Sequence, residues 1–191
     1  MSRVNATHFE RIPTFPNPKD KNIVHAIIET PRNIRHKFAL EPKYGILKLK
    51  QTIAQGLAWP YDYGFVPQTL ADDGDPTDIV FLSDAPTFPG CLVEARILGI
   101  IRLKKNGVEN DRIVACPLRM DGVAQNTDKY DDIKDIPKET LESLCRFLVE
   151  YSSDEDNTIT FEGVRSRKKA KKSVGEGITA YRARRHAKKK G

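Results

Sequence analysis

The chain has 191 residues, of which 39% are hydrophobic and 30% charged, with a formal net charge of +6; this composition fits one compact domain with a single core. No apolar run is long enough to span a bilayer, and the N-terminus lacks the pattern of a secretory signal. Cys91, Cys116 and Cys145 are widely spaced without a Cys-x-x-Cys pair, which is typical of a reducing compartment and argues against a zinc site. We therefore predict a cytoplasmic protein that does not associate with membranes.

Most of the predicted elements are strands. Apolar runs and alternation, enriched in β-branched residues, predict strands at residues 23–30, 45–50, 79–82, 92–103 and 112–116. A helical stripe of apolar residues predicts a helix over residues 137–151, and a last strand is expected near residues 158–163. Many strands with few, late helices predict a mainly β fold with flanking helices (α+β), in which the sheet is closed or nearly closed.

The C-terminal segment is strongly basic. Residues 165–191 contain 12 Lys or Arg and a single acidic residue, Glu176. We divide the chain into a folded domain at residues 1–164, which includes the 137–151 helix, and a basic C-terminal helix or tail at residues 165–191. Such cations can bind nucleic acid through counterion release. Because Tyr181 is the only aromatic residue among them, a solvated terminal helix is the favoured interpretation.

An acidic turn at residues 72–78, Asp-Asp-Gly-Asp-Pro-Thr-Asp, is the most informative segment. Gly74 and Pro76 bend the chain, so that Asp73, Asp75 and Asp78 can converge, and their mutual repulsion favours a hard divalent cation. An EF-hand loop is excluded because a strand-like sequence begins too soon after the turn. The competing interpretation is an Asx-rich surface turn without a ligand.

The residues before this turn carry a family resemblance. Residues 59–69, Trp-Pro-Tyr-Asp-Tyr-Gly-Phe-Val-Pro-Gln-Thr, followed by the acidic turn, resemble the signature region of the family I soluble inorganic pyrophosphatases. Further matches, in the same order along the chain, occur at residues 27–31, 89–90, 99, 112–117 and 130–137. The resemblance implies an OB-like five-stranded closed β-barrel at residues 1–164. It also implies a homo-oligomer, with a hexamer favoured.

The resemblance further implies Mg²⁺-dependent hydrolysis of pyrophosphate to two phosphates, in which bound cations neutralise the phosphoryl oxygens and acidify the attacking water. Asp73, Asp75 and Asp78 match the metal ligands, with Asp75 also serving as the general base. Asp78 is expected to bridge two ions. Mn²⁺ or Zn²⁺ could replace Mg²⁺ at such a carboxylate site.

Five further positions match family site residues. Lys37, Arg112 and Tyr151 match substrate-binding positions, and Glu29, grouped with them, matches an acidic site residue near an outer metal. Tyr63 is expected to contact substrate and to orient a metal-bound water. Each has a simpler alternative: Glu29 as a surface carboxylate, Lys37 as a solvated cation, and the tyrosines as core aromatics.

The chain departs from the family pattern at the edge of this site. Charged residues of the family are replaced at Ala39, Gln51, Lys105, Asn106, Asn110 and Ser152, and Arg112 replaces a Lys. Among acidic residues that could substitute as metal ligands, we take Asp111 as the first choice. Glu109, Asp62 and Asp72 are the others.

These departures leave alternative functions open. In the favoured one, the chain is an active inorganic diphosphatase that binds fewer metal ions or uses other residues as metal ligands. In the second, the chain keeps the fold with weak or no turnover and serves as a binding or assembly component through its basic tail. A third is hydrolysis of a different phosphoanhydride, since Gln51 and Ser152 would make room for a larger substituent.

Overall fold

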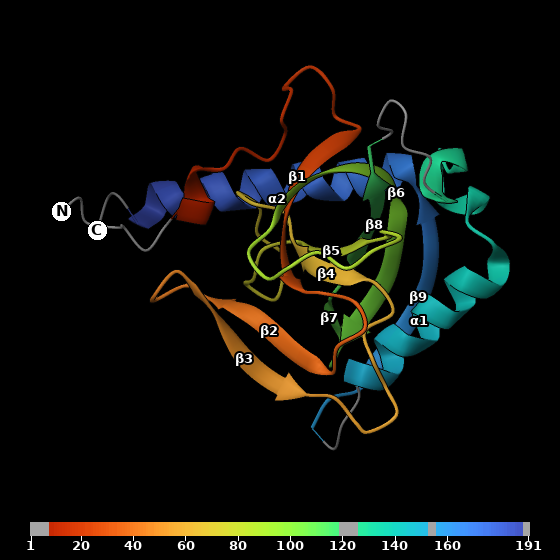
Figure 1. Ribbon diagram of the computed structural model, residues 1–191. Helices are drawn as coiled ribbons and strands as arrows, with labels where there is room; N and C mark the ends of the chain where they lie inside the picture. The colour runs from red at the N-terminus through yellow and green to blue at the C-terminus, as the bar shows by residue number, and fades with distance from the viewer. Residues whose placement is uncertain (1–7, 119–125, 153–155, 189–191) are drawn as a thin grey trace.

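The computed structural model describes residues 8–118, 126–152 and 156–188, and its centre is a closed ring of five strands (Figure 1). In order around the ring, the strands are β1 (Ile23–Thr30), β4 (Asp62–Phe65), β5 (Asp78–Phe81), β8 (Arg112–Pro117) and β6 (Leu92–Lys105). The ring closes because β1 pairs with both β4 and β6. Strands β5 and β8 are parallel, and the other neighbours are antiparallel. The predicted closed five-stranded barrel is confirmed.

Further elements surround this ring. The strands outside it are β7 (Val108–Glu109) and β9 (Ile159–Ser166), which pair with β6, and β2 (His36–Glu41) and β3 (Ile46–Thr52), which form a separate antiparallel arm. The helices are η1 (His8–Arg11), η2 (Asn126–Lys129), η3 (Ile133–Asp135), α1 (Lys138–Ser152) and α2 (Arg167–Lys188). In Figure 1, α2 runs across one end of the ring, α1 lies beyond β9, and the β2–β3 arm projects on the opposite side.

Alternation along the strands directs apolar side chains into two core clusters. One cluster joins residues of β4, β5, β6 and β8, such as Tyr63, to Leu144, Phe147 and Leu148 of α1. The other joins residues of β1, β5, β6 and β8 to Ala170 of α2. Helix α2 is thus packed against the barrel by its first half, although its sequence is strongly basic. No helix within the described ranges is long and apolar enough to cross a membrane.

Gly64 allows β1 and β4 to approach closely where the signature segment joins the barrel. A Cβ atom at this position would lie 1.9 Å from the carbonyl oxygen of Ile27, a distance that no side chain can occupy. Glycine therefore permits the pairing of β4 with β1, and this pairing fixes the neighbouring Tyr63. Tyr63 is one of the predicted site residues.

Candidate active site

The acidic turn connects β4 to β5, which pair antiparallel with Phe65 opposite Asp78. Two short hydrogen bonds shape its tip: the amide of Ala71 donates to the carbonyl of Asp75 at 2.7 Å, and the amide of Gly74 donates to the carbonyl of Ala71 at 3.0 Å. Gly74 has a φ of 90°, a conformation that glycine adopts without steric cost. The segment therefore forms a tight turn, and the carboxylates of Asp73 and Asp75 lie on either side of Gly74.

A cleft of about 770 Å³ lies in front of this turn. It is lined by residues of β1 to β8 and α1, together with the turn itself. The predicted site residues that line it are Glu29, Lys37, Tyr63, Asp73, Asp75, Asp78, Arg112 and Tyr151. Residues that are far apart in the sequence thus converge on one concave surface, which is the usual form of a small-molecule site.

The carboxylates of the turn are close enough to affect one another. Partial burial, and then the negative charges of Asp73 and Asp78, raise the pKa of Asp75 above its usual value. Asp73 accepts hydrogen bonds from the Asp75 amide, at 3.1 Å, and from the Asn110 side-chain amide. Asp78 lies 2.9 Å from the guanidinium of Arg112. A bound cation would relieve the repulsion that the raised pKa of Asp75 reports.

Two cations also line the cleft. Arg112 is only 5% exposed, and besides its ion pair with Asp78 it donates a hydrogen bond to the carbonyl of Asn110 at 2.7 Å. The ammonium of Lys37 lies 5.2 Å from the ring centre of Tyr151 and 5.8 Å from that of Tyr63, within the range of cation–π attraction. Arg112 thus lies directly against Asp78 of the acidic turn, and both cations line a cleft that can admit an anion.

The hydroxyl groups of Tyr63 and Tyr151 are buried and lack a hydrogen bond that meets normal geometry within the described part of the chain. Trp59 packs against both rings, with ring centres 5.0 Å and 4.6 Å away. Burial raises the pKa of Tyr63 well above its usual value, whereas Lys37 and Arg112 overcome the effect of burial and lower the pKa of Tyr151 to about 8. The Tyr63 hydroxyl lies beside Asp78, and the Tyr151 hydroxyl lies beside Arg112 and Ser152, so both are among the charged and polar groups of the cleft.

Comparison with known proteins identifies the family. The sequence pattern of the family described as inorganic pyrophosphatase matches residues 26–182. An inorganic pyrophosphatase of Haloferax volcanii is 29% identical over 174 residues, covering 91% of this chain and 95% of that protein. One from a Nostoc species is 30% identical over 175 residues, covering 90% and 98%. The chain belongs to the inorganic pyrophosphatase family.

Solved structures of the family share this fold. The inorganic pyrophosphatase of Thermus thermophilus is 29% identical, with a TM-score of 0.81 over 91% of this chain and 98% of that chain. The protein from Neisseria gonorrhoeae is 27% identical, with a TM-score of 0.82 over 91% and 99%. The barrel that holds the cleft is therefore the barrel of the inorganic pyrophosphatases.

Glu29 is the most perturbed carboxyl group in the cleft. It lies near the end of β1, is 6% exposed, and accepts a hydrogen bond of 2.6 Å from the amide of Leu40. Burial raises the pKa of Glu29 to about 8, because the opposing effects of the Leu40 amide and Lys37 are smaller. Glu29 is thus a buried residue of the cleft, where burial favours its protonated form.

Asp111, our first choice of substitute ligand, lies outside the residues that line the cleft. Its carboxylate is 2.7 Å from the Nε atom of Arg102 and accepts a hydrogen bond from the amide of Leu103. Glu109 is also paired with Arg102. Asp62 is fully buried, where it accepts hydrogen bonds from two backbone amides. Among the four acidic residues considered as substitutes, Asp72 alone lines the cleft.

Sequence reasoning missed Lys50 as a site residue. The pairing of β2 with β3 shifts from Lys37 opposite Gln51 to Phe38 opposite Leu49, so Lys50 is the extra residue of a β-bulge. Lys50 lines the cleft and lowers the pKa of Asp75 through its charge. The available signal was that Lys50 lies next to Gln51, the residue that replaces a family arginine. The bulge that turns the Lys50 side chain toward the cleft is not visible in the sequence.

The donors of the cleft are chemically suited to a hard divalent cation, and inorganic pyrophosphatases generally require a divalent metal. They are carboxylate oxygens; the amide oxygen of Asn110 instead accepts a hydrogen bond from Arg112, and its amide nitrogen donates one to Asp73. Within the described ranges, no three His, Cys, Asp or Glu side chains are already gathered as a metal cluster. Asp78 is paired with Arg112 instead. The carboxylates of Asp73, Asp75 and Asp78, which all line the cleft, are the residues that fit such a cation.

Proposed function

We propose that this chain hydrolyses inorganic pyrophosphate to two phosphates with Mg²⁺ held by Asp73, Asp75 and Asp78. The observation that carries the proposal is the convergence of acidic, basic and tyrosine side chains from distant elements on one cleft. The alternative, in which the chain only binds or assembles with other molecules, gains no support from the relatives. Both are inorganic pyrophosphatases, and the match covers 95% and 98% of their lengths. Mn²⁺ and Zn²⁺ remain possible replacements for Mg²⁺.

When bound, a divalent cation would neutralise phosphoryl oxygens and make a water molecule more acidic. Asp75, which lines the cleft together with Asp73 and Asp78, accepts the proton of the attacking water. The water oxygen forms a bond to one phosphorus atom. The bond from that phosphorus to the bridging oxygen breaks, and its electron pair leaves with the second phosphate.

The cationic side of the cleft holds the two phosphates. Arg112 is kept in place by Asp78 and Asn110 and presents a planar guanidinium suited to phosphate oxygens. Lys37 adds a second charge beside the tyrosine rings. The hydroxyl of Tyr63 stays protonated because its pKa is raised, so it can donate a hydrogen bond to the substrate or to the attacking water. Tyr151 sits between Lys37 and Arg112 and orients them.

Lys50 supplies a third phosphate-binding cation. Lys50→Gln should raise the KM for pyrophosphate by about 5- to 30-fold, since a charge-assisted contact contributes roughly 1–2 kcal/mol. Lys48→Gln is the matched control, because Lys48 lies on the same strand but outside the residues that line the cleft, and its KM should change by less than about twofold. Equal KM values for the two variants, measured from initial rates of phosphate release, would contradict a role for Lys50.

The function is tested by measuring phosphate release from pyrophosphate with Mg²⁺ and with a chelator, alongside the melting temperature under both conditions. Because a ligand of the native state stabilises it, Mg²⁺ should raise both the rate and the melting temperature. If Mg²⁺ raises neither, both the metal site and the reaction are wrong.

We also keep a homo-oligomer, with a hexamer favoured, and a cytoplasmic location as predictions. The large apolar side chains exposed on the arm, Tyr44, Ile46 and Leu49, are compatible with contacts between copies. The division of the chain at residue 164 likewise stays a prediction. Its boundary falls within β9, which runs from Ile159 to Ser166.

A further inference from the structure

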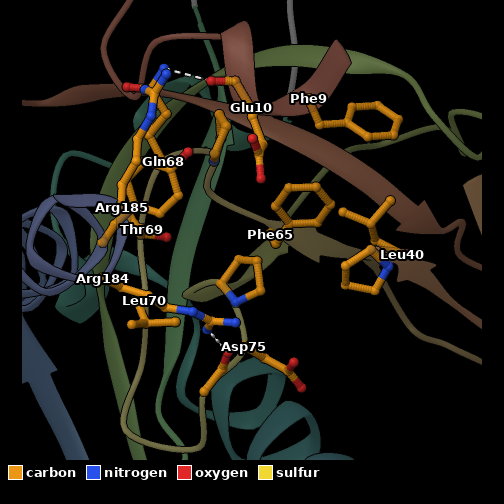
Figure 2. Close-up of a pocket in the computed structure, with 15 residues that line it drawn as sticks. Phe9, Glu10, Leu40, Phe65, Gln68, Thr69, Leu70, Asp75, Arg184 and Arg185 are labelled. Carbon is orange, nitrogen blue, oxygen red and sulfur yellow. Dashed lines mark hydrogen bonds between the residues drawn. The ribbon is translucent and has the colours of Figure 1, made fainter. Parts of the chain in front are cut away.

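The acidic turn has a second cavity behind it. This cavity, of about 270 Å³, is bordered by η1, the end of α2 and apolar side chains that include Phe9 and Phe65 (Figure 2). Asp75 and Pro76 line both this cavity and the catalytic cleft. The turn therefore separates two open spaces, and close packing does not support it from behind.

The base of the turn is attached to α2. The amide of Leu70 donates a hydrogen bond of 3.0 Å to the carbonyl of Gly177. A Cβ atom on Gly177 would come within 2.9 Å of the Thr77 hydroxyl, so the absence of a side chain lets the helix and the turn meet. The hydroxyl of Thr69 accepts a hydrogen bond of 2.9 Å from the amide of Thr77 and joins the two ends of the turn. These contacts fix its base, whereas the metal-binding carboxylates extend toward its tip.

The tip is held by Arg184. Its Nη1 atom donates a hydrogen bond of 2.9 Å to the carbonyl of Gly74, which lies 110 residues away in the sequence (Figure 2). Arg184 follows Gly177 by about two helical turns, so one side of α2 contacts both the base and the tip. A hydrogen bond from a guanidinium is stronger than one between neutral groups. Its acceptor, Gly74, is the residue between Asp73 and Asp75. A small movement of the backbone at Gly74 therefore changes the distance between the two carboxylates.

Arg184 lies beyond residues 26–182, the part of the chain that matches the family pattern. The residue that holds the tip therefore comes from the basic end of this chain rather than from the matched region. In the described part of the chain, η1, which forms another wall of the cavity, also lies outside the match.

We propose that Arg184 is a positioning residue for the metal-binding turn. By holding the Gly74 carbonyl, it keeps Asp73 and Asp75 at the separation that a divalent cation requires, and it lowers the repulsion among the carboxylates. This proposal rests on the proposed function for the role of Mg²⁺. Its structural part, that the end of α2 restrains the turn, is independent of turnover.

The test replaces Arg184 and follows both metal dependence and backbone protection. Arg184→Ala should raise the Mg²⁺ concentration for half-maximal activity by about 3- to 10-fold, while kcat at saturating Mg²⁺ stays within about twofold of the wild type. Arg184→Lys retains the charge and should show a smaller increase. In the metal-free protein, Arg184→Ala should also increase hydrogen exchange at residues 71–75.

Arg185→Ala is the matched control. Arg185 lines the same cavity but has no hydrogen bond to the turn among the described residues, so both readouts should match the wild type. Unchanged metal dependence and unchanged exchange in Arg184→Ala would overturn the proposal. Faster exchange throughout β5 and α2 would overturn it too, because that result indicates general loss of stability. If the wild type hydrolyses nothing, the proposed function fails, and exchange at residues 71–75 still decides whether Arg184 restrains the turn.

Discussion

Asp75→Asn should reduce phosphate release from pyrophosphate by about 100- to 10,000-fold at saturating Mg²⁺, the range expected on removal of a general base. An asparagine cannot accept the proton of the attacking water, and its neutral oxygen holds Mg²⁺ less firmly. Asp75 is suited to this role because it lines the cleft on the same turn as Asp73 and Asp78. The measurement is kcat from initial rates across a Mg²⁺ titration, which separates weaker metal binding from slower chemistry.

Asp72→Asn provides the control for this effect. Asp72 is exposed on the same turn and lines the same cleft, so its replacement removes an equal charge at a neighbouring position. We expect a change of less than about tenfold, because Asp72 is neither the proposed general base nor one of the three proposed metal ligands. Similar losses in both variants would mean that the total charge of the turn matters rather than the position of Asp75.

Glu29 should make the metal-free protein less stable as the pH rises. Burial raises the pKa of Glu29 from 4.5 to about 8 in the folded protein, so the folded state retains a proton that the unfolded chain releases. The resulting stabilisation is fully present below about pH 4.5 and is lost as the pH rises toward 8. The full loss amounts to up to about 5 kcal/mol, at 1.36 kcal/mol for each unit of pKa.

Glu29→Gln tests this dependence because glutamine has no proton to lose. In the presence of a chelator, the variant should lose much less unfolding free energy than the wild type between pH 5 and 8, and it should be the more stable protein at pH 8. Urea denaturation at several pH values measures this difference. Glu94→Gln, at an exposed position on β6, should follow the wild type. Parallel curves for Glu29→Gln and the wild type would show that Glu29 is ionised in the folded protein.

The sequence predicted the strands whose own residues are strongly apolar. Strand β1 was expected over the observed residues, and β6 and β8 were found within a few positions, because apolar residues make up more than half of each of the three. Strand β2, His36–Glu41, was not predicted: one of its faces borders the cleft through Lys37 and Ala39, so it lacks a buried apolar pattern. Strand β4 has only four residues and contains Gly64, a residue that weakens any strand signal.

The candidate site was predictable where local sequence determines geometry. The turn at residues 72–78 could be recognised because Gly74 and Pro76 restrict the backbone around the carboxylates. The direction of Asp111 could not be predicted, since it depends on Arg102 of β6 coming next to it when β6 and β8 pair. Lys50 was missed for a similar reason: its orientation follows from a bulge in the β2–β3 pairing. Both depend on contacts between strands that are distant in the sequence.

The most direct test of the central claim is phosphate release from pyrophosphate by the purified chain as Mg²⁺ is added to the chelated protein. We predict no release above the uncatalysed rate in the chelator and a saturable increase with Mg²⁺, because the acidic turn must hold the cation before water can be activated. The absence of release at every Mg²⁺ concentration, or a rate that the chelator does not change, would contradict the account.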